Sequence, residues 1–518
     1  MSKAKWLIMF LLALSMAVPT FAVELTLGGF PSYMRTRARF ISNATFISAL
    51  SNNNAKQLGY NDNDDNIFFA DTTLRLTPQL VLSDAVTIRA QLNVFDNNIW
   101  GGSTTGFLGG RNGVVNSSLS FSDRFRGALL TGPGAIDDPG FFDVRMLHAD
   151  IVLPNNLGFI RVGRQPFDWG IGILANGGWD PYSDLGFVLD RFLYLKSFAA
   201  GPGSLTFVFV TDRFTQGNSV VTGTGDGWDG GAAALIFNHP NMMGTNFTLG
   251  GYIFPYIHQT NIGSLPGTGV DSGLPSGAGV ASGLDLERLT LYSGLIDVKT
   301  DLWRLVGEIQ GAWGNLNLEG FGDIDIDASN IIFAARAEVY PGWPLKIVAA
   351  EFGWSKGDDV TTGELEGGAI FFNPAYNIDN LLFKNMIPNI YQVESSVYNA
   401  YYARIWGTVK LVDSISFTPQ VIVAFNEETS NPLPGVTNIS SYMGTEVEGT
   451  ITWHIHPGVS FDLIGGVVFT GDSLNELLEG QALNTLAQND INPDRVNYDE
   501  TPWTVQGRLM IFIDQFFK

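Results

Sequence analysis

The stretch from Trp303 to Trp313 constrains the fold of this chain more than any other. One parity carries only apolar residues and glycine, and the other carries Arg304, Glu308 and Gln310. Successive side chains of a β-strand point to opposite faces, so this segment would have one apolar face and one polar face. Ten residue steps at about 3.3 Å, tilted by about 40°, cover roughly 25 Å, the height of a barrel's apolar band between two aromatic girdles. The segment therefore predicts a membrane-spanning β-strand.

The same alternation recurs along the chain, in pairs of segments joined by very short turns. The predicted strands are residues 25–40, 69–82, 85–96, 143–153, 158–169, 187–197, 203–214, 229–239, 245–257, 284–299, 302–315, 329–340, 345–355, 397–411, 414–426, 442–456, 458–470 and 502–517. A membrane interior has no water to pair a free strand edge, so the sheet must close. We expect an all-β, closed antiparallel transmembrane barrel of about eighteen strands, with short periplasmic turns and long extracellular loops.

Composition agrees with a barrel and excludes several other classes of protein. The formal net charge of −22 disfavours a nucleic-acid partner. A mean hydropathy of +0.11 with 15% charged residues suits a chain whose outer face meets lipid. Because the chain has no cysteine, it is not a lipoprotein, a c-type haem carrier or a disulfide-stapled domain.

The first residues predict export from the cytoplasm. Lys3 and Lys5 precede an apolar run from Trp6 to Val18, and small residues follow as far as Ala22. This pattern is typical of a secretory signal peptide, here residues 1–22, and leaves residues 23–518 as one barrel domain. The aromatic, amphipathic last strand resembles the assembly signal of outer-membrane proteins. We therefore expect the Gram-negative outer membrane as location, with its lipid, lipopolysaccharide and assembly machinery as partners.

Charged side chains on the strands indicate which face lines the lumen, because Arg or Lys facing lipid at mid-membrane costs about 2 to 4 kcal/mol. The predicted lining residues are Arg35, Arg37, Arg39, Arg75, Arg89, Arg304, Glu308, Arg336, Arg404, Glu446, Glu448 and Arg508. A barrel of about sixteen to eighteen strands encloses an aqueous channel. The arginines form either a basic stripe that attracts anionic solutes or a salt-bridge ladder with Glu308, Glu446, Glu448 and loop carboxylates. The sequence leaves both interpretations open.

Two long loops are candidates to narrow the channel. Residues 97–142 and 356–396 are both long enough to fold inward, and the second is rich in apolar residues. Its candidate constriction residues are Phe371, Phe372, Tyr376 and Phe383. Because such a segment would otherwise expose a large apolar patch to water, we expect it to fold into the lumen.

Several motifs resemble those of the alginate-export-like family of eighteen-stranded outer-membrane porins. They are Val162 to Gln165 with the following Asp168 to Gly170, the acidic run Asp180 to Asp184, Asp190-Arg191, Gly353 to Asp359, and Asn373 to Phe383. The resemblance implies a passive outer-membrane channel, and in one branch of the family an anionic saccharide as solute. The carboxylates of Glu308, Glu446 and Glu448 reduce the net positive charge that the lumen of that branch is expected to have.

Acidic clusters suggest a possible cation site but no catalytic one. Asp323, Asp325 and Asp327, together with Asp358 and Asp359, offer the oxygen ligands that Ca²⁺ prefers, and we expect them in extracellular loops. The first cluster lacks the glycine and the final glutamate of a calcium loop, so solvated loop acids are the competing interpretation. No nucleophile, base and orienting acid stand out as a set, so the sequence predicts no enzyme and no required cofactor.

Three functions are consistent with this sequence. The first is a porin-type channel for passive passage of small hydrophilic, anionic solutes or saccharides. The second is a barrel that sheathes a periplasmic cytochrome as part of an electron conduit. The third is a surface receptor or adhesion barrel with a plugged lumen. Conductance across a lipid bilayer separates the first from the others.

Overall fold

The computed structural model describes most of the chain. The described residues are 24–27, 31–42, 67–99, 143–183, 186–216, 227–259, 284–318, 322–387, 397–433, 436–477 and 501–516. The predicted signal peptide at residues 1–22 lies outside them, as does nearly all of the predicted loop 97–142.

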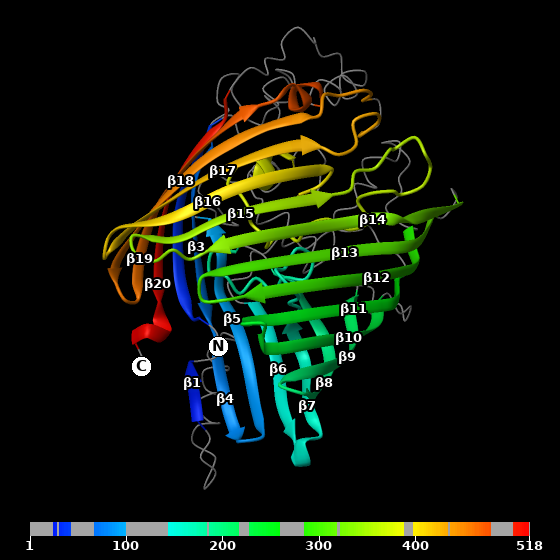
Figure 1. The fold of residues 1–518 in the computed structure, drawn as a ribbon, viewed down its shortest axis with the longest axis vertical. Helices are drawn as coiled ribbons and strands as arrows, with labels where there is room; N and C mark the ends of the chain where they lie inside the picture. The colour runs from blue at the N-terminus through cyan, green and yellow to red at the C-terminus, as the bar shows by residue number, and fades with distance from the viewer. Residues whose placement is uncertain are drawn as a thin grey trace, which may run out of the picture.

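Twenty strands form one sheet, and they follow one another around a cylinder (Figure 1). They are β1 (Glu24–Leu27), β2 (Tyr33–Ile41), β3 (Ile67–Leu76), β4 (Pro78–Ser83), β5 (Val86–Ile99), β6 (Asp143–Leu153), β7 (Gly158–Pro166), β8 (Val188–Ala200), β9 (Gly203–Gln216), β10 (Gly227–Met242), β11 (Thr245–Gln259), β12 (Leu284–Lys299), β13 (Trp303–Leu318), β14 (Gly322–Val339), β15 (Leu345–Ser355), β16 (Ala400–Val412), β17 (Ile415–Asn426), β18 (Tyr442–His456), β19 (Val459–Thr470) and β20 (Trp503–Phe512). The labelled short helical segments are η2 (Pro154–Asn156), η4 (Leu382–Met386) and η6 (Ile513–Phe516).

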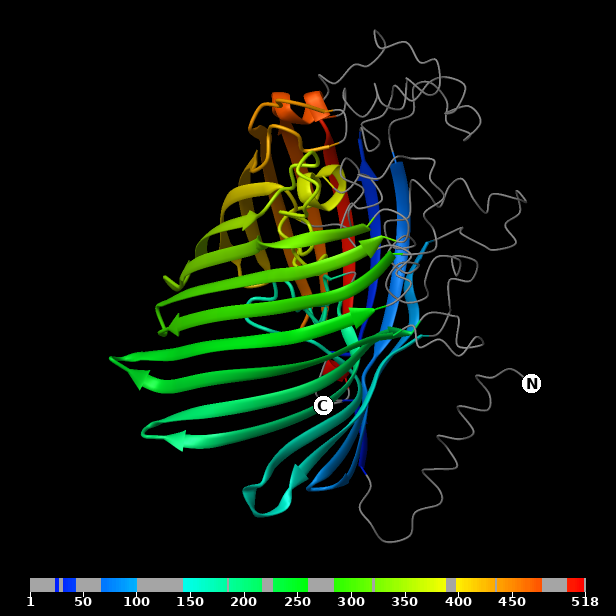
Figure 2. The same ribbon diagram turned by 90° about the vertical axis from the view of Figure 1, so that its right-hand side faces the viewer.

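These labels correspond to eighteen barrel strands. β1 and β2 are successive parts of one strand, and so are β3 and β4, which only Thr77 separates: β1 pairs with β4 and β2 pairs with β3. Every neighbouring pair is antiparallel, and β20 pairs with both β19 and β2, which closes the cylinder. The predicted closed antiparallel barrel is therefore confirmed. Short turns join the strands at one end, where the hairpins of the green strands gather on the left of Figure 2.

Strand β13 has the predicted alternation of apolar outward and polar inward side chains. Leu305 and Ile309 are exposed on the outer face, whereas Glu308 and Gln310 are fully buried on the inner face. The outward residues form part of the apolar band that meets lipid, and the inward ones belong to the lumen. No helix in the described part of the chain is both long and apolar enough to span a membrane.

The predicted start of β14 and the predicted end of β20 were wrong. β14 begins at Gly322, seven residues before the predicted start, so it continues as a strand beyond the apolar band. β20 ends at Phe512, and the 3₁₀ turn η6 replaces the last predicted strand residues, where the backbone N–H of Ile513 donates to the carbonyl of Ser32. Single-sequence alternation cannot locate such ends, because the pattern continues after the pairing partner stops.

Candidate functional site

The lumen wall from β2 to β7 is basic. Seven arginines share this inner face with Asp71 and Asp150: Arg35, Arg37, Arg39, Arg75, Arg89, Arg145 and Arg161. Arg37 and Arg39 both bind Asp71, with N–O distances of 2.8 and 2.7 Å. We call this wall the basic sector.

The wall from β12 to β18 carries an acidic sector. Its six carboxylates are those of Asp297, Glu308, Glu338, Glu351, Glu446 and Glu448, and three arginines, Arg304, Arg336 and Arg404, lie among them. Four strands, β8 to β11, separate the two sectors on one side and two, β19 and β20, on the other, so the sectors face each other across the cylinder. A solute in the lumen would therefore meet positive charge on one side and negative charge on the other.

The arginines do form salt bridges, but not with the predicted partners. Arg336 and Arg404 bind Glu351, at 2.6 and 3.0 Å, and Arg304 binds Asp297 at 2.8 Å. Further pairs join Arg89 and Arg161 to Asp150, and Arg508 to Asp462 at 2.9 Å. These acids lie on neighbouring strands, and the sequence interpretation named none of them. Glu308, Glu446 and Glu448 bind loop or amide N–H groups instead.

Residues 167–183, Gly186 and Phe187, which we call loop A, follow β7 and cross the lumen. On one side, carbonyl oxygens of the loop accept hydrogen bonds from the basic sector: Arg35 donates to Pro181 at 2.9 Å and Arg75 donates to Gly178 at 3.2 Å. On the other side, the carboxylate of Glu308 accepts the N–H groups of Ile171 at 2.7 Å and Gly172 at 3.0 Å. The loop thus presents carbonyls to the basic sector and amides to the acidic one.

Two glycines make the contact between loop A and β13 possible. Gly170 and Gly172 both have positive φ, at 58° and 87°, which glycine adopts without strain. A Cβ on Gly170 would lie 2.3 Å from Oε2 of Glu308. Any other residue at this position would therefore displace the carboxylate that holds the loop. The predicted family motif covers part of this segment, but the sequence analysis did not predict that the segment folds into the lumen. The apolar residues Trp169, Ile171 and Ile173 could have indicated it.

Residues 356–387 and 397–399, which we call loop B, follow β15 and line the acidic sector, as predicted for 356–396 (Figure 2). The Tyr376 hydroxyl donates to Glu351 at 2.9 Å, and the Leu382 N–H donates to Glu446 at 2.8 Å. Asn380 donates its side-chain amide to Glu448 at 2.7 Å. Residues 388–396 lie outside the described residues, whereas all four predicted constriction residues lie within them.

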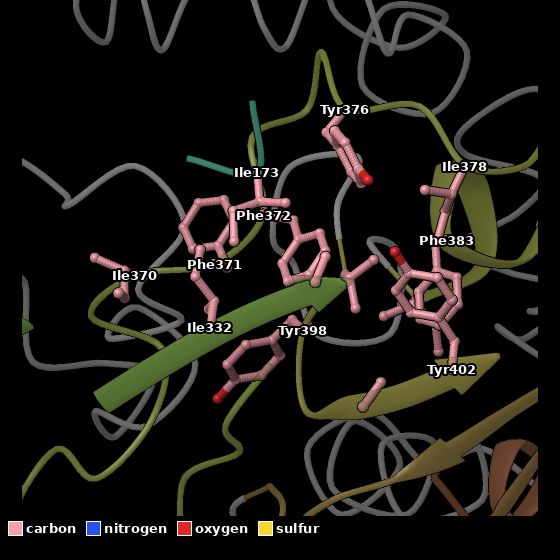
Figure 3. Close-up of a cluster of buried hydrophobic side chains, with 14 of the residues drawn as sticks. Ile173, Ile332, Ile370, Phe371, Phe372, Tyr376, Ile378, Phe383, Tyr398 and Tyr402 are labelled. Atoms are coloured by element: carbon pink, nitrogen blue, oxygen red, sulfur yellow. The ribbon is translucent and has the colours of Figure 1, made fainter. Parts of the chain in front are cut away.

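The constriction candidates of loop B belong to an apolar cluster inside the barrel. Figure 3 shows Ile173 of loop A beside Phe371 and Phe372, and Phe383 beside Tyr402 of β16. Phe372 and Phe383 are at most 2% exposed. The backbone also joins the loops, since the Asn373 N–H donates to the carbonyl of Ile173 at 2.6 Å. The two loops therefore form one layer across the lumen, held by an apolar core and by polar contacts with the wall.

The predicted calcium ligands do not form one loop site. Asp323, Asp325 and Asp327 lie on β14, which is a correction, because we expected them in a loop. Asp358 and Asp359 do lie in loop B, where Asp358 accepts the Glu366 N–H at 2.8 Å and Asp359 accepts the Thr361 hydroxyl at 2.7 Å. Within the described residues, no group of three or more acidic or histidine side chains is arranged to hold a metal ion.

Three carboxylates meet where loop B contacts β18. Asp379 accepts the N–H groups of Phe383 at 2.6 Å and Lys384 at 3.0 Å, and Glu446 and Glu448 lie beside it. Burial, reinforced by the charge of Glu448, raises the pKa of Asp379 to about 7. A released Asp379 would titrate near 3.8. The binding of loop B to the barrel wall therefore weakens as pH rises from about 4 to about 7. In this range Asp379 keeps its proton when the loop is bound and loses it when the loop is detached.

We expect loop B to be cleaved faster by an added protease at pH 8 than at pH 5.5, relative to an Asp379→Asn variant measured at each pH. Asparagine cannot ionise, so the variant removes this residue's share of the pH dependence and corrects for the protease's own pH profile. A ratio of the two cleavage rates that stays constant between pH 5.5 and 8 would contradict the assignment.

The predicted family motifs lie at the roots of both inward loops. Gly163 has a φ of 118°, and a Cβ there would lie 2.4 Å from the carbonyl oxygen of Leu147. Arg164 points to the outer face and binds Asp190 at 2.9 Å, while Gln165 donates to the carbonyl of Arg191 at 3.0 Å. The motif thus joins β7 to β6 and β8 just before loop A begins. Its arginine does not line the channel.

No protein-family model matches this chain, and no curated protein sequence matches it either. The resemblance to the alginate-export-like family therefore stays a prediction. Among solved structures, the chain is similar to OpdO of Pseudomonas aeruginosa, with 10% identity and a TM-score of 0.41 over 93% of this chain and 96% of that one. It is also similar to OccAB1 of Acinetobacter baumannii, with 10% identity and a TM-score of 0.43 over 93% of this chain and 96% of that one. OccD3 (OpdP) of Pseudomonas aeruginosa gives 10% identity and a TM-score of 0.40, over 97% and 98% of the two chains.

Proposed function

We propose that this protein is an outer-membrane channel for passive passage of small hydrophilic solutes, with a preference for anions. The observation that carries the proposal is the lumen of the closed barrel, where a basic sector faces an acidic sector and loop A joins them. Opposed charges orient and draw in small polar solutes without binding them tightly. In the proposed channel, the two inward loops bind the wall and narrow the passage.

The same observation weighs against the two alternatives. A sheath for a periplasmic cytochrome needs an open lumen, yet loops A and B are packed against each other inside this one. A receptor barrel with a completely plugged lumen would not need charged side chains along its inner wall. A selective channel needs these charged side chains, together with loops that fill only part of the lumen.

The test is conductance in planar lipid bilayers. We expect the purified protein to give discrete steps in potassium chloride, with a reversal potential under a salt gradient that indicates chloride preference. Absence of steps from correctly folded barrels, identified by their heat-dependent gel migration, would contradict the proposal. Co-purification of a haem protein would support the sheath instead.

The anion preference should depend on the arginines of β2. Replacing Arg35, Arg37 and Arg39 by glutamine removes three positive charges from the basic sector, and we expect the channel to lose its chloride preference. At about 8 Å through water, one charge contributes about 0.5 kcal/mol, or roughly a twofold change in local ion concentration. Reversal potentials measure the change.

Asp71→Asn is the matched control for this charge change. Asp71 pairs with Arg37 and Arg39, so its neutralisation leaves them in place and removes a negative charge. We expect the shift in reversal potential to have the opposite sign. If both variants keep the wild-type selectivity, the basic sector serves only to hold the wall together.

A further inference from the structure

The lumen wall between the two charged sectors is apolar. On β8 to β11 the inward side chains include Leu193, Val208, Val210, Ala234 and Ile236, all buried or half-buried. Large barrels normally line their lumen with polar residues, since water fills it. An apolar stretch several strands wide inside the barrel is therefore a feature that the proposed passage of hydrophilic solutes does not need.

Loop A covers this wall without filling the space beneath it. A cavity of about 300 Å³ lies between the wall and three aromatic side chains of the loop, Phe167, Trp169 and Trp179. Trp169 lies edge-on to Tyr252 of β11, with ring centroids 5.0 Å apart, and would touch a Cβ on Gly250. We call this cavity the apolar bay.

Charges at the edge of the bay are balanced. Arg191 binds Asp212 at 2.5 Å, and both side chains are at most 4% exposed. Arg161 and Arg89 bind Asp150 at 2.6 and 3.0 Å. Asp168 accepts the Gly177 N–H at 2.6 Å and the indole N–H of Trp179.

The two arginines that line the bay, Arg161 and Arg191, are thus each paired with an aspartate, and the lining carboxylate of Asp168 is held by two N–H groups. An anion or a cation entering it would leave water without meeting a surplus of opposite charge, which is unfavourable. An uncharged apolar group would lose only its hydration, and burying it is favourable.

We propose that the apolar bay binds uncharged small molecules that carry an aromatic ring, and that it does so during their passage through the channel. The volume suits one ring with a short substituent, since a cavity of about 150 Å³ already holds benzene. The wall offers aliphatic contacts, and the loop offers ring edges and faces for aromatic packing. The inference rests on the proposed channel function and extends its solutes to neutral aromatic compounds.

Benzyl alcohol is the probe, with glycerol and benzoate for comparison. In single-channel recordings we expect benzyl alcohol to interrupt the potassium chloride current reversibly, benzoate to do so less, and glycerol not at all. Ala234→Phe places a ring inside the bay and should weaken the interruption at least about tenfold, which corresponds to about 1.4 kcal/mol. Val208→Thr keeps the shape of the wall but adds a hydroxyl, and should weaken it to a smaller extent.

Ala233→Phe is the matched control, because residue 233 is adjacent on β10 and shares the outward parity of the exposed Leu235. We expect it to behave as the wild type, which also corrects for partition of the alcohol into the bilayer. Equal interruption in Ala234→Phe and Ala233→Phe would overturn the proposal. Benzoate acting more strongly than benzyl alcohol would overturn it too, because recognition would then depend on charge.

A binding measurement separates this inference from the channel proposal. Line broadening of 3-fluorobenzyl alcohol in ¹⁹F spectra reports contact with the amphipol-solubilised protein whether or not it conducts. Broadening that Ala234→Phe removes and Ala233→Phe retains supports the bay even if no conductance is found. Conductance without any such broadening leaves the channel proposal intact and overturns the bay.

Discussion

Replacing Glu351 by alanine is expected to release loop B from the barrel wall. Its carboxylate accepts hydrogen bonds from Arg336 at 2.6 Å, Tyr402 at 2.6 Å, Tyr376 at 2.9 Å and Arg404 at 3.0 Å. Removing one partner of a buried ion pair costs about 3 to 5 kcal/mol, because the other charge stays buried without compensation. Here two guanidinium groups, 18% and 8% exposed, would lose the same carboxylate.

Limited proteolysis of the folded barrel measures this release. We expect cleavage within residues 370–387 in Glu351→Ala but little in the wild type. Glu351→Gln keeps an acceptor and loses the charge, so it should fall between them. Asp413→Ala is the control, since Asp413 is exposed in the turn after β16 and water screens its pair with Lys410. Wild-type resistance in Glu351→Ala would show that the apolar cluster alone holds the loop.

Replacing Glu308 by alanine is expected to widen the passage. Glu308 is fully buried and accepts the N–H groups of Ile171 and Gly172, which are the contacts of loop A with β13. Losing a charged acceptor of this kind costs about 2 to 3 kcal/mol. The ratio of seated to released loop would then fall roughly 30- to 150-fold. We expect larger single-channel conductance with frequent transitions between levels.

Asp297→Ala is the matched control for this experiment. It removes one lumen carboxylate from the neighbouring strand, but that carboxylate binds Arg304 and not loop A. Its conductance should stay near the wild-type value. If Glu308→Ala and Asp297→Ala conduct alike, then loop A is held by its other contacts with Arg35 and Arg75 and does not limit the current.

The strands could be predicted because their signal is local. In β13, the parity of Arg304, Glu308 and Gln310 identified the inner face before any partner strand was known, and the structure confirms it. Charged side chains avoid lipid, so the positions of the charged residues in each strand identify its inward face. The same reasoning failed at the end of β20, where pairing and not parity decides where a strand stops.

Ion-pair partners could not be predicted because they depend on strand register. The salt-bridge interpretation offered Glu308, Glu446, Glu448 and loop carboxylates as partners of the arginines, yet Arg336 stands directly opposite Glu351 on β15. In the same way Arg37 stands opposite Asp71 on β3, an acid that the sequence interpretation did not single out. Cross-strand neighbours lie about 4.5 to 5.5 Å apart, so a shift of one residue would exchange every partner.

The inward course of loop B could be predicted from its own residues, whereas that of loop A depends on residues far away in the chain. The apolar content of loop B, including Phe371, Phe372 and Phe383, predicted that it would fold inward. Loop A is shorter and richer in glycine, and its course depends on Glu308, which lies far from it in the chain. No pattern within residues 167–187 names that acceptor. The apolar bay was missed for the same reason, because it needs loop A above the wall of β8 to β11.

The sequence by itself determined the barrel: the number of strands and the face of each strand that meets lipid. Those properties follow from a two-residue period and the thickness of a membrane, which act on each strand separately. Only the tertiary structure decided which arginine meets which carboxylate, how loop A crosses the lumen, and where an apolar cavity remains. These features need residues from strands and loops far apart in the chain, and closure of the barrel alone brings them together.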